Sequence, residues 1–160
     1  MRNVELERLL AVDKAALDMN PYQTYRFCLR CVESVECNLE SDLVLECLRE
    51  FRGYVESGVF RDESIMTELA GRVSALARSH PGSTSIDGSR HAAVSATHAL
   101  AAAVAGRVVD AAAYAAYSQV YGYGGYALSD PSNFEAIHRQ QVGWWRQLQK
   151  ASNSGCVANL

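Results

Sequence analysis

The chain has 160 residues, which is long enough to bury a core as one domain. Of these residues 49% are hydrophobic and 21% are charged, a composition that excludes wholesale disorder. Its net charge of −3 is uneven, because residues 1–70 carry 14 acidic and 8 basic side chains whereas residues 71–160 carry 4 and 7. The acidic first half argues against a nucleic-acid surface there, and it suits either a basic protein partner or an ordinary solvated helical surface.

The chain lacks the apolar stretches that direct a protein into or across a membrane. No apolar run approaches the length of a membrane span, and residues 1–5 do not resemble the apolar region of a signal peptide. Five cysteines without an export signal favour reduced thiols over a disulfide framework. We therefore expect a cytoplasmic protein that binds neither membranes nor nucleic acid.

Apolar residues at helical spacing predict four helices in the first half of the chain. These helices are expected over residues 4–18, 21–39, 42–57 and 62–80. Pro21 stands at the first position of the second helix and Gly58 follows the third, as is typical of helix ends. Leu43 is expected on the buried face of the third helix and Ile65 on that of the fourth.

The middle of the chain is unusually rich in alanine, which makes up 13 of the 25 residues from Ala92 to Ala116. Alanine is the strongest helix former and leaves almost no side chain between neighbouring backbones. The stretch therefore predicts two closely packed helices, over residues 89–105 and 108–121, that are separated near Gly106. We expect this hairpin to be central and buried.

The segment Tyr-Gly-Tyr-Gly-Gly-Tyr at residues 121–126 contains three glycines, which make continued helix doubtful. Tyr123 and Tyr126 are therefore expected to be exposed, where they would suit recognition of a partner. A last helix is expected from Asp130-Pro131, and residues 151–160 look like a frayed tail. No strand pattern competes, so the predicted fold is all-α: a single domain over residues 1–160, built as a compact bundle of about seven helices.

Cys28 and Cys31 form a CxxC pair within the second predicted helix. A structural zinc site needs four ligands that converge, usually from a knuckle or loop, and no matching His/Cys pair follows. A thioredoxin-like motif would need a neighbouring βα unit. Buried reduced thiols are therefore the preferred interpretation.

His91 and His98 lie seven residues apart, so they share a helix face but stand about 10 Å apart along its axis. No HExxH, ExxH or i, i+4 carboxylate pair accompanies them, and hydrolase and nucleotide-binding motifs are missing as well. We expect no metal, no cofactor and no enzymatic activity, with the histidines hydrogen-bonded at helix interfaces.

The alternative is a helical enzyme or sensor that binds a small molecule. Asp110, Tyr114 and Tyr117 recur at helical spacing along the sixth predicted helix, and His91 and His98 come from the fifth. A pocket lined by these five residues is the alternative site. The same tyrosines also suit a bundle core or a protein interface.

The segments 90–93, 97–100 and 110–117 resemble the alanine-rich C-terminal part of the all-helical immunity proteins of bacterial polymorphic toxin systems. The similarity covers roughly residues 65–150. It implies a non-catalytic, cytoplasmic protein that binds a cognate toxin domain and covers its active site. The toxins of such systems include nucleases, deaminases and other nucleotide-directed enzymes.

An acidic surface can compete for the basic substrate cleft of such a toxin. The candidate partner-binding residues are the exposed tyrosines Tyr123 and Tyr126, together with six acidic residues around the second and third helices: Glu33, Glu36, Glu40, Asp42, Glu46 and Glu50.

Overall fold

The computed structural model describes residues 1–19, 21–58, 63–80 and 89–155. Helices account for nearly all of these residues. These residues form seven α-helices, two short 3-10 helices and no strand, so the predicted all-α fold is confirmed. The elements are α1 (Val4–Met19), α2 (Pro21–Glu33), η1 (Glu36–Asn38), α3 (Asp42–Ser57), α4 (Glu63–Ser79), α5 (Ser89–Val104), α6 (Val108–Gly122), η2 (Gly125–Ser129) and α7 (Ser132–Gly155).

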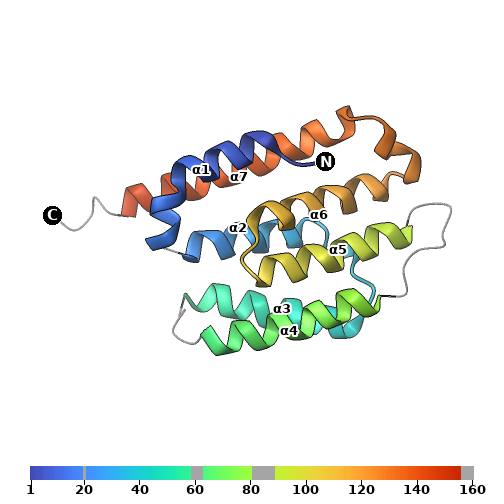
Figure 1. Ribbon diagram of the computed structural model, residues 1–160, viewed down its shortest axis with the longest axis horizontal. Coiled ribbons are helices and arrows are strands. Elements are labelled where there is room, and N and C mark those ends of the chain that lie inside the picture. Colours follow the sequence, from blue (N-terminus) through green and yellow to red (C-terminus); the bar gives the residue numbers. More distant parts are fainter. Residues whose placement is uncertain (20, 59–62, 81–88, 156–160) are drawn as a thin grey trace.

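The helices lie in three tiers (Figure 1). α1 and α7 form one edge, α3 and α4 form the opposite edge, and α2 lies with the α5–α6 hairpin between them. α5 and α6 make the most extensive contact between any two described helices, and α2 packs against both. The alanine-rich hairpin therefore occupies the centre of the fold, as predicted.

Small side chains allow this close packing. Most alanines of the hairpin are buried, namely Ala92, Ala93, Ala96, Ala99, Ala101, Ala102, Ala103, Ala111, Ala112, Ala115 and Ala116. The turn between the helices is a Schellman motif, in which the Arg107 amide donates to the Ala102 carbonyl at 2.9 Å and the Gly106 amide to the Ala103 carbonyl at 3.0 Å. Gly106 has φ +69°, a left-handed conformation that favours glycine.

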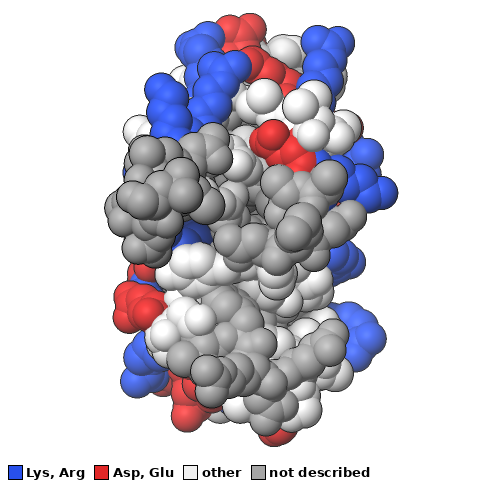
Figure 2. All heavy atoms as spheres, turned by 90° about the vertical axis from the view of Figure 1, so that its left-hand side faces the viewer, with Lys and Arg blue, Asp and Glu red and all other residues white. Residues whose placement is uncertain are grey.

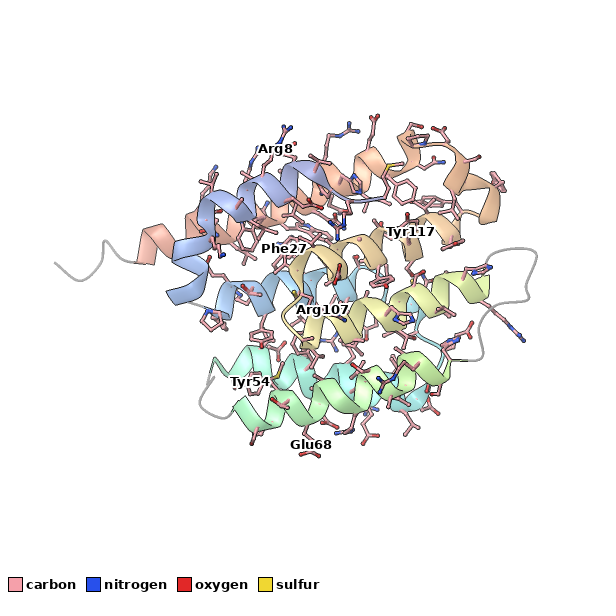
Figure 3. The ribbon with its side chains drawn as sticks, viewed as in Figure 1. Arg8, Phe27, Tyr54, Glu68, Arg107 and Tyr117 are labelled. Carbon is pink, nitrogen blue, oxygen red and sulfur yellow. The ribbon has the colours of Figure 1, made fainter. Side chains whose placement is uncertain are left out.

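The outer tier is joined to the centre by a buried tryptophan. Trp145 of α7 packs edge-on against Phe27 of α2, with ring centroids 5.4 Å apart, and its indole Nε1 donates to Asp13 of α1 at 2.8 Å. Figure 3 shows Phe27 between α2 and the α1–α7 pair. One side chain thus fixes three helices.

Buried amides tie the start of the chain to the bundle. The Asn3 side chain accepts a hydrogen bond from the Leu6 amide at 3.1 Å, which caps α1, and it donates to Gln141 of α7 at 3.1 Å. Gln141 in turn donates to the Ala112 carbonyl of α6 at 2.8 Å. These bonds satisfy polar groups that burial would otherwise leave unpaired.

The predicted end of the second helix is wrong, because α2 ends at Glu33 and not near Leu39. The Ser34 hydroxyl donates to the Cys31 carbonyl at 2.7 Å, and the Val35 amide bonds to Val32, an i to i+3 contact. Such local side-chain bonds compete with α-helix. Val35 and Leu39 are still buried, but a 3-10 turn brings them to the core.

The structure also differs from the prediction at two expected core residues and in part of the expected tail. Leu43 and Ile65 are 59% and 51% exposed, so the apolar faces of α3 and α4 are narrower than their sequences suggest. α7 continues to Gly155, beyond the predicted end near residue 150. Gln23 of α2 donates to the Ser152 hydroxyl, which anchors this last part of α7. Residues 156–160 lie outside the described chain.

We expect Gly106→Ala to lower the free energy of unfolding by about 1 kcal/mol, because a Cβ disfavours the left-handed conformation. Gly71→Ala is the matched control: Gly71 lies within α4 and a Cβ there meets nothing within 4 Å. That change should raise the unfolding free energy by roughly 0.5–1 kcal/mol. Urea unfolding followed by circular dichroism measures both, and equal shifts would contradict the role given to Gly106.

Candidate functional site

An open hollow of about 650 Å³ lies where the end of α6 meets the connection between α2 and α3. We call it the tyrosine hollow. Its lining comprises Cys37, Asn38, Glu40, Ala92, Tyr121, Gly122, Tyr123, Gly124, Gly125 and Tyr126. Three of the predicted partner-binding residues, Glu40, Tyr123 and Tyr126, therefore come together at one place.

Gly124 determines the shape of one wall. α6 ends at Gly122, and Gly124 follows with φ 113° and ψ 150°, a conformation that is essentially confined to glycine. A Cβ at Gly124 would lie 2.6 Å from Cε1 of the Tyr126 ring. The ring therefore rests against bare backbone, although Tyr126 is 81% exposed.

The opposite wall is held by a buried hydroxyl. Ser118 of α6 donates to the Ala92 carbonyl of α5 at 2.8 Å and accepts a hydrogen bond from the Asn38 side chain at 2.9 Å. Gln119 donates to Ser34 at 2.9 Å beside it. These bonds position η1, and hence the Cys37 to Glu40 segment, against the end of α6.

Sequence reasoning missed Cys37, Asn38 and Ser118. Asn38 and Ser118 are separated by 80 positions, and neither belongs to a recognisable motif. The one available signal was the polar character of Ser118 within an apolar, alanine-rich helix, which required a buried partner.

Among the described residues that line the hollow, Glu40 alone is charged. No ion pair joins Glu40, Asp42 or Glu46 to another residue in the described ranges. All three side chains are exposed. They extend from the hollow along the beginning of α3, where Asp42 and Glu46 are one turn apart.

The other three acidic candidates form ion pairs within the protein, and two of them share one arginine. Arg52 binds Glu33 at 2.9 Å and Glu36 at 2.7 Å. Arg72 of α4 holds Glu50 through two hydrogen bonds of 2.8 and 2.9 Å. These carboxylates contribute less to the surface field than their number in the sequence suggests. Figure 2 shows another face of the molecule, the left-hand side of Figure 1, on which acidic side chains are interspersed with Lys and Arg.

The structure does not bring the alternative pocket residues into one site. His91 stacks on Tyr121 with centroids 4.9 Å apart, and His98 stacks on Tyr114 at 5.2 Å. The expected hydrogen bonds are absent: no side-chain hydrogen bond joins either histidine to another described residue, and their contacts are these ring pairs.

The remaining two pocket candidates are Asp110 and Tyr117, and the Tyr117 ring centroid lies 6.4 Å from that of Tyr121, on which His91 stacks. Asp110 pairs with Arg107 at 3.8 Å and lines a different hollow with Leu10 and Lys14. Tyr117 packs edge-on against Phe134 of α7 at 5.3 Å, between α6 and the following segment in Figure 3.

The CxxC cysteines are buried, as predicted, and neither forms a disulfide with another described residue. Burial raises the pKa of the Cys28 thiol to about 12. The pKa of Cys31 is raised well above its usual value, first by burial and second by the charge of the neighbouring Cys28 thiolate. Burial also raises the pKa of Cys47. Cys37 differs, because it is exposed in the tyrosine hollow.

The described residues thus define an all-α protein with an open hollow lined by tyrosines. Among them, no group of three or more His, Cys, Asp and Glu residues is arranged to hold a metal ion, and no helix is long and apolar enough to span a membrane. No protein-family model matches the chain, and no curated protein or solved structure shows significant similarity to it.

Alkylation should distinguish the thiols. A pKa of about 12 leaves roughly one Cys28 thiol in ten thousand ionised near pH 8, and only the thiolate reacts. We expect iodoacetamide to label Cys37 first among Cys28, Cys31, Cys37 and Cys47, as measured by peptide mass spectrometry. All four should react in denaturant; equal labelling in the native protein would show that the CxxC pair is accessible.

His98 should make the protein less stable in mild acid. Burial, followed by the charges of His80 and Arg107, lowers the pKa of His98 below its usual value. The unfolded chain therefore takes up this proton first, at about pH 6.5, so stability falls as the pH decreases through that value. His98→Gln should weaken the decrease between pH 7.5 and 5.5 in urea unfolding. A folded-state titration by NMR at or above 6.5 would contradict this assignment.

Proposed function

We propose that this protein binds another protein through the tyrosine hollow, and that the partner is a bacterial toxin domain whose active site it covers. The observation that carries the proposal is the exposure of two aromatic side chains, Tyr123 at 61% and Tyr126 at 81%, at the edge of one hollow. Tyrosine combines a broad apolar face with a polar tip, and it is among the residues that contribute most to protein interfaces.

The frame of the hollow supports this role. Gly124 and the Ser118 hydrogen bonds hold both walls in place, and η2 begins after Tyr123 and includes Tyr126. A surface that is ordered before it binds loses less conformational entropy on association. Tight inhibition of a toxin requires such a surface.

The charges on this side of the molecule favour a basic partner. Glu40, Asp42 and Glu46 form no ion pair with another described residue, whereas Arg52 and Arg72 reduce the negative charge of Glu33, Glu36 and Glu50. Enzymes that act on nucleic acids use basic clefts to bind phosphates. Carboxylates placed near such a cleft increase the association rate and compete with the substrate. The resemblance of residues 65–150 to immunity proteins points to the same class of partner.

The alternative, a small-molecule enzyme or sensor, has less support. His91, His98 and Asp110 are held in separate contacts. The large hollow has a suitable volume for a ligand, but its charged lining consists of one exposed carboxylate.

Growth of a bacterial host provides the test. The C-terminal domain encoded by the adjacent gene is expressed alone, with this protein, or with the Tyr123→Ser/Tyr126→Ser double variant. We expect the native protein to restore colony formation and to co-elute with the domain in size-exclusion chromatography. Loss of two central interface tyrosines should weaken binding at least about tenfold.

Tyr114→Ser is the matched control, because Tyr114 is a partly exposed tyrosine outside the hollow. It should restore growth as the native protein does. Cys37 should be protected from iodoacetamide in the complex, since it lines the hollow. A harmless neighbouring domain, or one whose toxicity the native protein does not relieve, would contradict the immunity function; rescue by the double variant would place the interface elsewhere.

A further inference from the structure

We propose that the tyrosine hollow is a recognition site for a guanidinium group, the side chain of an arginine on the partner. This inference rests on the proposed function and specifies which chemical group the partner inserts. Three features of the hollow favour a cation: Glu40, the end of α6 and the tyrosines that flank this helix end.

The first feature is the charge of the lining. Of the lining residues that the structure describes, Glu40 alone is charged and none is Lys, Arg or His. No ion pair with a described residue neutralises the Glu40 carboxylate. A cation that enters the hollow is therefore attracted by the Glu40 carboxylate and is repelled by no positively charged residue of the described lining.

The second feature is the end of α6. Its last residue, Gly122, lines the hollow, and no basic residue stands in its last turn. The aligned peptide dipoles of a helix place the equivalent of about half a negative charge at its C-terminus. The carbonyls of Val120 and Tyr121 already accept hydrogen bonds from the Tyr123 and Gly124 amides, and no basic side chain in the last turn offsets the partial charge that remains.

The third feature is the aromatic lining. A cation over the face of a tyrosine within about 6 Å of the ring centroid is attracted by the negative face of the ring. Tyr121, Tyr123 and Tyr126 all line the hollow. The chain already uses this contact elsewhere, since Arg26 lies 5.4 Å from the Tyr22 ring centroid and Arg30 lies 5.1 Å from that of Trp144.

A guanidinium fits these features better than an ammonium ion. It is planar, it stacks on aromatic rings, and its parallel N–H groups match both oxygens of a carboxylate. The hollow of about 650 Å³ is much larger than one such group, so an arginine presented on a protein segment is a better occupant than a free ion.

Titration by NMR tests the site without the partner. The probe is the tripeptide acetyl-Gly-Arg-Gly-amide, added to ¹⁵N-labelled full-length protein. We expect saturable shifts of the Gly122, Gly124 and Gly125 amide signals. The citrulline analogue has nearly the same shape but no charge, and it should bind at least fivefold more weakly.

Glu40→Gln should reduce arginine binding to the level of citrulline. Glu68→Gln is the matched control, because Glu68 is an exposed glutamate on α4, at the far edge of the molecule in Figure 3, and should leave the shifts unchanged. Equal binding of both peptides, shifts centred elsewhere, or binding that does not depend on Glu40 would overturn the proposal.

The two proposals can fail separately. If the tyrosine double variant abolishes growth rescue but the arginine peptide does not bind, the partner uses the hollow without inserting an arginine, and the guanidinium inference is wrong. If the peptide binds but the native protein rescues no toxin, the site exists and the immunity function is wrong.

Discussion

The close approach of α5 and α6 is the contact on which the rest of the structure depends. Alanine leaves the two backbones near enough for the Ser118 hydroxyl of one helix to reach the Ala92 carbonyl of the other. A larger residue in place of the buried alanines would separate the helices and overpack a filled core. The Ser118 hydroxyl also accepts a hydrogen bond from the Asn38 side chain, so the central packing also determines where η1 lies. The hollow at the end of α6 is thus a direct result of the alanine content of the chain.

Local patterns in the sequence were sufficient to predict most of the fold. The alanine-rich hairpin, the position of Gly106 and the beginning of α3 follow from propensity and end signals that involve only neighbouring residues. The end of α2 does not, because the bond from Ser34 to the Cys31 carbonyl overrides an apolar pattern that continues to Leu39. The extension of α7 depends likewise on Gln23, which is distant in the sequence.

The site was only partly predictable for the same reason. Exposure of Tyr123 and Tyr126 follows from the glycines between them, whereas their meeting with Glu40 requires the tertiary fold. The acidic surface was overestimated because composition counts charges without their partners. Arg52 and Arg72 lie 16 or more positions from the glutamates that they bind, and nothing in the local sequence identifies these pairs.

Gly124 lets the Tyr126 ring lie against the backbone outside the core, so this tyrosine contributes little to the stability of the fold. The Tyr126 ring lies on a backbone without a Cβ and is mostly in solvent, so little of the core depends on which side chain occupies that position. If the proposed binding role is correct, substitutions at positions 123 and 126 will alter partner choice while the alanine hairpin and the glycine turn stay unchanged. In a binding protein, this arrangement allows substitutions at exposed positions to adapt the interface to a partner that changes during evolution, while the fold is kept.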